Sequence, residues 1–456
     1  MKLKIILICV VFLCISCIKT GNLPEKLDPM KSKSNFGIDL SLSPDDDSFP
    51  HWDHDTIVKR VSDMNIKWTR ETVMQSGVEY PKGVYHWESH DRIIKKWQQH
   101  NIHLLVAIFG STNFEPPVIN NKEFDGVDDE NTTSIRNPGY KLVPTNNGYG
   151  NAKSTLDEWT SFVEHVVERY DGDGYKDMPG LKYPIKYWES WNEPNYWSEW
   201  GGFWNVKWPD STNTEDIRFL KKLHKSFYKA VKRADPEALV VGPSVLTRSS
   251  YETDHRKEFY CAEDMYEYFD FVNYHRNHRY SWVDWDSSTI CVKDKPIWVT
   301  EFNRHKKSGE TVHQNNIELI KLFIQGGYCT QNRLHRAYHY FEQADQNMYF
   351  DLTQPGYPLK ELGRYVKLIF TLLDESEPVE FDKNSNSVHY TFVKEDSVIH
   401  VLWSDINETT VNISTERNSI ELIRLDGIRR RMELQDKSLE LELTNEPIFV
   451  VEKIIK

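Results

Sequence analysis

Short apolar segments alternate with longer amphipathic segments from residue 36 to residue 373. The short segments are rich in β-branched and aromatic residues and end at polar or turn-forming residues. This pattern is typical of strands that are buried on both faces of a parallel sheet. It predicts eight strands, at residues 36–40, 67–70, 104–109, 185–191, 239–242, 271–274, 297–300 and 337–341.

Amphipathic helices are predicted between these strands. Three segments carry apolar side chains at helical spacing on one face: residues 155–170, 215–234 and 312–325. The third of these helices is expected to end at Gly326-Gly327, because glycine commonly follows the last helical turn. Eight strand–helix units predict a (β/α)₈ TIM barrel, an α/β fold, over residues 35–375.

The pattern changes at about residue 376. Short strands are predicted from there on, at residues 387–393, 398–403, 410–413, 420–425, 439–443 and 448–451. Alternation of apolar and charged residues, as in Leu439-Glu-Leu-Glu-Leu443, is typical of a half-buried strand. Because no helical pattern intervenes, residues 376–456 are predicted to form a small C-terminal β-sandwich. It is expected to pack against the barrel, and glycan binding is the alternative role.

Two of the predicted barrel strands end in a carboxylate. The stretch Tyr187-Trp-Glu-Ser-Trp-Asn-Glu-Pro-Asn195 delivers Glu193, and Lys295-Pro-Ile-Trp-Val-Thr-Glu-Phe-Asn303 delivers Glu301. The two glutamates belong to strands four and seven, and the ends of barrel strands meet at one face. Two carboxylates at such a face are what displacement at a sugar carbon requires, since one protonates the leaving oxygen while the other attacks the carbon or activates water.

The two strand-end segments resemble those of the glycoside hydrolases of clan A. The match rests on Trp191-Asn-Glu-Pro-Asn195 and on the strand that ends at Glu301, and within the clan it is most similar to family 39, the β-xylosidase and α-L-iduronidase family, which also includes bacterial endoglycosidases. Three further segments are similar to clan patterns: Trp68-Thr-Arg-Glu71, Leu239-Val-Val-Gly-Pro-Ser244 and Asp270-Phe-Val-Asn-Tyr-His275. The last barrel strand departs from the family, because Tyr338-His-Tyr-Phe-Glu342 lacks the tryptophan that many members carry there.

The resemblance implies a retaining mechanism on a β-linked glycan or glycoside. Glu193 is then the acid/base and Glu301 the nucleophile, and Asn192 is expected to hydrogen-bond the sugar 2-hydroxyl group. Glu301 must be ionised to attack, whereas Glu193 must start protonated, so the pKa of Glu193 has to be raised by burial and by the neighbouring charge. This chemistry needs no cofactor.

Arg70 has two possible roles. It is expected either to lie under Glu301 and keep that carboxylate ionised, or to form a buried structural ion pair with Glu189 or Glu71.

Other strand ends offer further candidates for the sugar site. Tyr274 and His275 either orient the nucleophile from strand six or serve only in packing. Glu342 binds a sugar hydroxyl from strand eight or caps the barrel rim. Six aromatic residues follow Glu193, and Trp197 and Trp200 among them are expected to stack on sugar rings, the alternative being a small core under that loop.

The amino-acid composition indicates which kind of molecule the protein binds. Aromatic residues make up 13% of the chain, which suits a carbohydrate ligand, and the formal net charge of −13 argues against nucleic acid. The sequence carries no recognisable metal-binding motif, so no metal is expected. Two competing functions stay open: a surface glycan-binding lipoprotein that has kept the barrel without turnover, and a transglycosylase that uses the same carboxylates.

The N-terminus indicates export. Residues 1–17 combine Lys2 and Lys4 with a short apolar run and end in Cys14-Ile-Ser-Cys17, which resembles a bacterial lipoprotein signal with Cys17 as the acylated residue. It departs from that pattern because Cys14 stands where leucine is usual. An ordinary secretory signal is the alternative. Residues 18–34 are expected to be a polar tether, which makes the protein a cell-envelope lipoprotein whose only link to the membrane is its lipid anchor.

Three cysteines lie outside the signal segment, namely Cys261, Cys291 and Cys329. A disulfide between Cys261 and Cys291 and three buried thiols are both compatible with the sequence.

Overall fold

The computed structural model describes residues 32, 34, 36–42, 53–79, 83–109, 113–114, 153–154, 156–193, 214–247, 256–276, 292, 295–302, 304, 306–328, 336–340, 349–384, 386–406 and 408–454. The predicted lipoprotein signal at residues 1–17, with Cys17, lies outside these residues. None of the helices within them is both long enough and apolar enough to cross a membrane.

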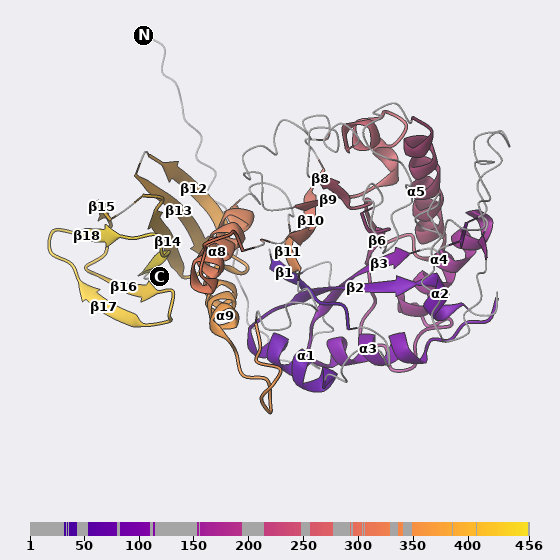
Figure 1. Cartoon of the computed structure of the whole chain (residues 1–456), viewed down its shortest axis with the longest axis horizontal. Coiled ribbons are helices and arrows are strands. Elements are labelled where there is room, and N and C mark those ends of the chain that lie inside the picture. The colour runs from indigo at the N-terminus through magenta and orange to yellow at the C-terminus, as the bar shows by residue number, and fades with distance from the viewer. Residues whose placement is uncertain are drawn as a thin grey trace, which may run out of the picture.

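A parallel sheet of nine strands forms the larger part of the chain, in the order β7-β6-β3-β2-β1-β11-β10-β9-β8 (Figure 1). The strands are β1 (Phe36–Asp39), β2 (Trp68–Met74), β3 (His103–Phe109), β6 (Tyr187–Ser190), β7 (Leu239–Val241), β8 (Val245–Thr247), β9 (Val272–Arg276), β10 (Ile297–Phe302) and β11 (Arg336–Tyr340). Each of the eight predicted barrel strands has a counterpart among them.

The two ends of this sheet meet, so the sheet closes into a barrel. The terminal strands β7 and β8 follow each other along the chain and are separated by Gly242-Pro-Ser244. Parallel bridges join Asn192 to Ser244 on one side and Val241 to Phe271 on the other. Strands β7 and β8 therefore fill a single barrel position, the fifth, which gives the predicted (β/α)₈ TIM-barrel fold.

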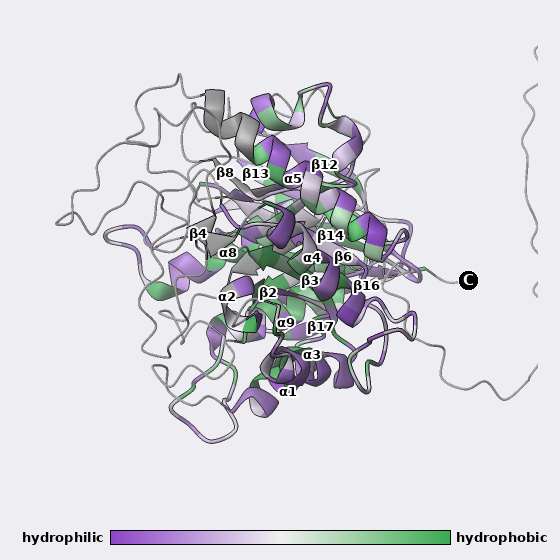
Figure 2. Cartoon of the chain, turned by 90° about the vertical axis from the view of Figure 1, so that its right-hand side faces the viewer, coloured by the Kyte–Doolittle hydropathy of each residue, from purple (hydrophilic) through white to green (hydrophobic). Residues whose placement is uncertain are grey.

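Helices cover the outside of the barrel: α1 (His54–Asp63), α3 (Glu88–Gln99), α4 (Leu156–Tyr170), α5 (Thr214–Ala234), α8 (Val312–Tyr328) and α9 (Glu361–Leu373). Their apolar faces pack on the strands, and Figure 2 shows hydrophobic residues at the centre with hydrophilic residues on the outer faces of α1 and α5. The predicted helices at residues 155–170 and 215–234 are confirmed as α4 and α5.

The predicted end of the third helix is wrong. Helix α8 continues through Gly326 and Gly327 to Tyr328. A Cβ atom at position 327 would lie 2.5 Å from Cζ of Phe36, so this glycine permits close packing of α8 on β1. A close approach between distant segments therefore explains the glycine, which does not end the helix.

The interior of the barrel has an apolar end and a polar end. An aromatic cluster fills the first, with the rings of Tyr187 and Trp298 stacked 4.8 Å apart. Residues two positions further along the same strands also point inward, because side chains alternate along a strand. The resulting inward pairs are Trp68 and Arg70, Tyr187 and Glu189, Phe271 and Asn273, and Trp298 and Thr300. The polar end thus lies toward the carboxyl ends of the strands.

The C-terminal region is antiparallel. Its strands are β12 (Glu377–Lys383), β13 (Ser387–Lys394), β14 (Ser397–Ser404), β15 (Thr409–Ser414), β16 (Ser419–Arg424), β17 (Arg429–Glu433), β18 (Ser438–Leu443) and β19 (Ile448–Lys453). Six of them form a sheet in the order β12-β13-β14-β19-β16-β17, and β15 pairs with β18. A shared apolar core joins the two sheets, which gives the predicted sandwich.

The sandwich contacts the barrel through α8. Lys321 lies over the ring of Trp403 at 5.6 Å, and His313 lies 3.3 Å from Glu446. In Figure 1, α8 and α9 stand between this region and the barrel strands. Cys261 is disulfide-bonded, which excludes the alternative of three free thiols. Cys291 and Cys329 lie outside the described residues.

Candidate active site

Glu193 lies just beyond the carboxyl end of β6, where the backbone leaves regular strand geometry. Trp191 and Glu193 both have positive φ angles, of 67° and 39°. Such conformations cost about 1–3 kcal/mol for residues other than glycine and persist only where their surroundings hold them. Strand five stabilises this conformation, because the Glu193 N–H donates a 2.9 Å hydrogen bond to Ser244 Oγ. The carboxylate of Glu193 then lies beside His275 and Glu301.

Glu301 lies on β10, next to an irregularity in the sheet. Val299 pairs with Tyr274 and Glu301 pairs with His275, so Thr300 is an extra residue on β10. A bulge of this kind redirects the side chains that follow it. It brings Glu301 to the polar end of the barrel, opposite Glu193.

The two predicted carboxylates face each other across His275. Its Nδ1 atom lies 2.9 Å from Glu193 Oε1 and 3.3 Å from Glu301 Oε2. One carboxylate oxygen of each glutamate lies within 4.8 Å of the other. The side chains of Glu193 and Glu301 are 14% and 20% exposed, whereas that of His275 is 1% exposed. The imidazole therefore lies beneath a carboxylate pair that reaches solvent.

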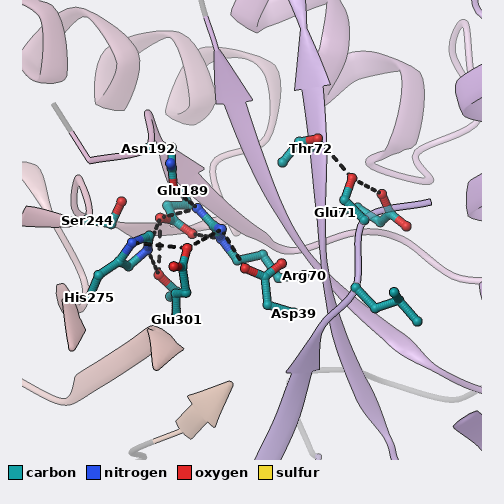
Figure 3. A network of polar contacts seen from close by, with 12 residues as sticks. Asp39, Arg70, Glu71, Thr72, Glu189, Asn192, Ser244, His275 and Glu301 are labelled. Carbon is teal, nitrogen blue, oxygen red and sulfur yellow. Dashed lines mark hydrogen bonds and ion pairs between the residues drawn. The ribbon is translucent and has the colours of Figure 1, made fainter. Parts of the chain in front are cut away.

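Arg70 combines the two roles that the sequence left open. Its guanidinium group forms a two-point ion pair with Glu189, at 2.7 Å and 3.0 Å. It also donates to Asp39 Oδ2 at 3.0 Å and to Asn192 Oδ1 at 2.9 Å. Its Nη1 atom lies 4.0 Å from Glu301 Oε2, so the positive charge also acts on that carboxylate (Figure 3).

Glu71, the other partner considered for Arg70, faces away from this network, as expected for the next residue along a strand. It accepts hydrogen bonds from Trp97 Nε1 and the Leu42 N–H.

Glu189 is the central acceptor below the pair and was not predicted as a site residue. It is fully buried. Besides Arg70, Asn273 Nδ2 donates to its Oε1 atom at 3.0 Å, and Thr300 Oγ1 lies 3.2 Å from the same oxygen. The sequence could have indicated this. Glu189 lies four residues before Glu193, and side chains an even number of positions apart on a strand point to the same face.

The site holds more acidic than basic groups. Burial raises the pKa of Glu301 to about 8; the negative charges of Glu193 and Asp39 add to this, and His275 and Arg70 oppose it. Burial also raises the pKa of Asp39 and lowers that of His275. Four carboxyl groups therefore face one guanidinium group and an imidazole that favours its neutral form. This imbalance keeps a proton on the carboxylate pair near neutral pH.

Glu193, His275 and Glu301 also have the donor types and spacing that a divalent cation takes. Two features oppose a cation there. The His275 Nδ1 atom already lies at hydrogen-bond distance from both carboxylates, and Arg70 places a fixed positive charge 4.0 Å from Glu301.

Some predicted site residues cannot be placed. The backbone of Tyr274 pairs with Val299 and Val245, but its side chain lies outside the described part of the chain. Trp197, Trp200 and Glu342 also lie outside it, and so does most of the loop after Glu193.

Comparison with known proteins assigns the fold. The sequence matches no family model and no curated protein. A family 39 glycoside hydrolase from the gut symbiont Bacteroides cellulosilyticus is 12% identical with a TM-score of 0.61, over 92% of this chain and 81% of that one. A family 30 endoxylanase from Clostridium papyrosolvens is 11% identical with a TM-score of 0.57, over 93% and 97% of the two chains.

A third structure, BuGH86 in complex with neoagarooctaose, is 12% identical with a TM-score of 0.53, over 93% of this chain and 75% of that one. The fold is thus that of the clan A glycoside hydrolases, with families 39 and 30 among the matched structures. Proteins of this fold include glycan-binding enzymes.

Proposed function

We propose that this protein is a retaining glycoside hydrolase that cleaves O-glycosidic bonds in a β-linked glycan or glycoside. The observation that carries the proposal is the spacing of Glu193 and Glu301, whose closest oxygens lie within 4.8 Å. Retaining glycosidases hold their carboxyl groups about 5–5.5 Å apart, whereas inverting enzymes need about 6.5–9.5 Å to admit a water molecule. The relatedness in fold to clan A enzymes supports the same mechanism.

In the first step, Glu301 attacks the anomeric carbon while Glu193 protonates the glycosidic oxygen. The bond to the leaving group breaks, and the sugar becomes esterified to Glu301. In the second step, Glu193 takes a proton from water, and the oxygen of that water displaces Glu301 from the sugar. Two inversions retain the configuration, and both carboxyl groups return to their starting states.

The hydrogen bonds of His275 support Glu193 as the group that holds the proton. Thr300 Oγ1 lies 2.9 Å from the oxygen of the Asn273 amide, to which it donates, and 3.2 Å from His275 Nε2. The hydroxyl then accepts from an Nε2–H. In a neutral imidazole this leaves a lone pair on Nδ1, which accepts a hydrogen bond from a protonated carboxyl group.

Of the two glutamates, Glu193 is the nearer to that lone pair, at 2.9 Å against 3.3 Å for Glu301. The charge of Arg70 meanwhile favours ionised Glu301. Once Glu301 is esterified its negative charge is gone, so the pKa of Glu193 falls and the group becomes a base.

Asn192 is suited to binding the sugar. Its Oδ1 atom accepts a hydrogen bond from Arg70, which leaves the amide N–H groups as donors. A hydrogen bond from this amide to the 2-hydroxyl group would strengthen as the transition state forms.

The test is hydrolysis of aryl β-glycosides (xyloside, glucoside, galactoside and mannoside), an aryl α-arabinoside and several polysaccharides. Wild type, Glu193→Ala and Glu301→Ala are compared, with exposed Glu395→Ala as the matched control. We expect Glu301→Ala to lose at least about a thousandfold in rate. Azide should rescue Glu193→Ala on an activated substrate and release a β-glycosyl azide. Binding without turnover, unaffected by either substitution, would instead indicate a glycan-binding protein.

We also propose, on the sequence alone, that residues 1–17 direct export and that Cys17 carries the lipid that anchors the protein to the cell envelope. Expression in a bacterial host should place wild type in the membrane fraction and Cys17→Ala in the soluble fraction. The same distribution for both would contradict the anchor.

A further inference from the structure

Asp39 is the last residue of β1, and its side chain points into the barrel. The start of the strand sets this direction, because Phe36 packs against Phe323 of α8 and Phe370 of α9, outside the barrel. Side chains alternate along a strand, so that of Asp39 faces the interior. Asp39 thus reaches the polar end of the barrel from a strand that supplies none of the groups in the proposed mechanism.

Arg70 binds one oxygen of Asp39 next to the proposed nucleophile. Its Nη1 atom donates to Asp39 Oδ2 at 3.0 Å and lies 4.0 Å from Glu301 Oε2 (Figure 3). Within the described part of the chain, the Asp39 carboxylate accepts no other hydrogen bond. Its Oδ1 atom is therefore an acceptor without a donor from these residues, in a side chain that is only 5% exposed. A buried acceptor of this kind costs free energy until a donor reaches it.

The position of Asp39 has an electrostatic cost for the proposed reaction, in which Glu301 must be ionised. Burial raises the pKa of Glu301 to about 8, and the negative charges of Glu193 and Asp39 raise it further. Arg70 already has a counter-ion, because Glu189 pairs with it at two points. Pairing with Arg70 therefore does not by itself account for a second buried carboxylate beside the nucleophile.

Asp39 and the acid/base approach the site from different sides. Around the barrel, β10 with Glu301 is two positions from β1 in one direction and three positions from β6, which leads to Glu193, in the other. In the proposed mechanism the leaving group lies against Glu193, which protonates it. The reacting sugar ring, which is attacked by Glu301, then extends away from the leaving group, toward the side of the barrel that β1 lines.

We propose that Asp39 binds a hydroxyl group of the reacting sugar and so determines which sugars the site accepts, an inference that rests on the proposed glycosidase function. Asn192 follows β6 and is expected to bind the 2-hydroxyl group, so the donor to Asp39 Oδ1 is the hydroxyl group on C3 or C4. A hydrogen bond from a hydroxyl group to a carboxylate is about twice as strong as one between neutral groups. A sugar that lacks this hydroxyl group leaves the buried oxygen without a donor and is rejected.

The same arrangement indicates the class of sugar. Asp39 and Glu301 place two carboxylates beside one nitrogen of Arg70, and Glu189 occupies two others. The carboxylate of a uronic acid would bring a further negative charge to this part of the barrel, with no cation left to pair with it among the groups of the described site. Neutral sugars offer hydroxyl donors and no charge, so they fit the site.

The experiment measures kcat/KM for the aryl β-glycoside that wild type hydrolyses best and for its 2-, 3- and 4-deoxy analogues, in wild type and in Asp39→Asn. Asparagine keeps an oxygen for Arg70 but has no second acceptor oxygen. Wild type should lose about 10- to 100-fold on the 3-deoxy or the 4-deoxy analogue. Asp39→Asn should lose about as much on the parent glycoside, with no further loss on that analogue.

Two controls accompany this comparison. On the 2-deoxy analogue the losses from the substitution and from the missing hydroxyl group should multiply, because Asp39 does not bind that group. Exposed Asp382→Asn should keep wild-type values on every substrate. Losses that multiply on the 3- and 4-deoxy analogues as well would show that Asp39 acts only as a counter-ion. Unchanged kcat/KM of wild type on both of these analogues would also overturn the proposal, even if Asp39→Asn does not fold.

The sugar class is tested with the aryl uronide of the same ring configuration. Wild type should prefer the neutral glycoside at least about tenfold in kcat/KM, and Asp39→Asn should reduce that preference. A preference that stays the same or grows in the variant would contradict the selectivity assigned to Asp39. Absence of turnover by wild type on every glycoside tested is a different outcome, because it would overturn the proposed function itself.

Discussion

Arg70 and Glu189 form a two-point ion pair inside the barrel, with 2.7 Å between Nε and Oε2 and 3.0 Å between Nη2 and Oε1. Both side chains are almost fully buried, at 3% and 0% exposure. Removing one partner of such a pair leaves an uncompensated charge, which costs about 3–5 kcal/mol. We therefore expect Glu189→Ala to lower the free energy of unfolding by about that amount, measured by urea denaturation.

Glu189→Gln separates the charge of Glu189 from its shape. The glutamine keeps an acceptor for Arg70 but removes one negative charge, so the guanidinium acts more strongly on Glu301 at 4.0 Å. The pKa of Glu301 should then fall, and the acidic limb of the kcat/KM profile should move to lower pH. An acidic limb that stays in place, in a variant that remains folded, would contradict this coupling.

His275 is expected to act on the proton of Glu193. If its neutral Nδ1 accepts that proton in a hydrogen bond, His275→Phe destabilises the protonated acid, and the basic limb of the pH profile moves to lower pH. A charged imidazolium would have favoured ionised carboxylates, so its loss would move the limb to higher pH. We expect kcat to fall about 10²-fold, with a smaller change in KM.

Thr300→Val tests the same proposed tautomer while the imidazole of His275 stays in place. It removes the hydroxyl group that lies 3.2 Å from His275 Nε2, so the imidazole is no longer held in one tautomer. The basic limb of the pH profile of Thr300→Val should move in the same direction as that of His275→Phe, but less far. Opposite shifts in the two variants would contradict the proposed tautomer.

The pH range of activity follows from the carboxylate pair. Activity needs one proton on the pair, so kcat/KM should fall as pH rises through about 8, the pKa to which burial raises Glu301. Glu193→Gln has no proton to lose from the acid position, so the fall above about pH 8 should disappear. Its reaction with an activated aryl glycoside should rise with pH as Glu301 ionises and then stay at a plateau, as single-turnover kinetics would measure.

The barrel could be predicted from the sequence because its strands are buried on both faces and therefore read as apolar runs that end at turn residues. Two C-terminal strands were missed for the opposite reason. Strand β17 (Arg429–Glu433) contains three consecutive arginines, and β12 (Glu377–Lys383) is mostly exposed. Each packs only one half-buried apolar side chain on the core, Met432 in β17 and Phe381 in β12, which is too few to give a period, so their pairing with neighbouring strands defines them.

The candidate site was predictable in its residue types but not in its geometry. The order of residues places Glu193 and Glu301 at strand ends. The extra residue at Thr300 and the positive φ angle of Glu193 depend on contacts with other strands, which a local pattern does not contain. The role of Gly327 could not be predicted either, because it depends on packing against Phe36, which lies far earlier in the sequence.

Glu71 gives a prediction about stability alone. It is buried on the outer side of β2, where burial raises its pKa to about 8. Its Oε1 atom accepts from Trp97 at 2.5 Å and Leu42 at 3.0 Å, and its Oε2 atom lies 3.0 Å from the Ser41 hydroxyl. A glutamine can keep all three contacts, with its carbonyl oxygen as acceptor and its amide donating to Ser41.

The native state therefore holds a proton on Glu71 more tightly than the unfolded chain, and stability is lost as pH rises from about 4.5 to about 8. Glu71→Gln should remove this part of the loss and raise the free energy of unfolding at pH 8 by at least about 1 kcal/mol, with little change at pH 4.5. Glu71→Ala should be destabilising at both pH values, because it leaves Trp97 Nε1 without its acceptor. Urea denaturation at the two pH values is the measurement, with Glu395→Gln as the exposed control. A constant difference between Glu71→Gln and wild type at the two pH values would show that Glu71 does not titrate in this range.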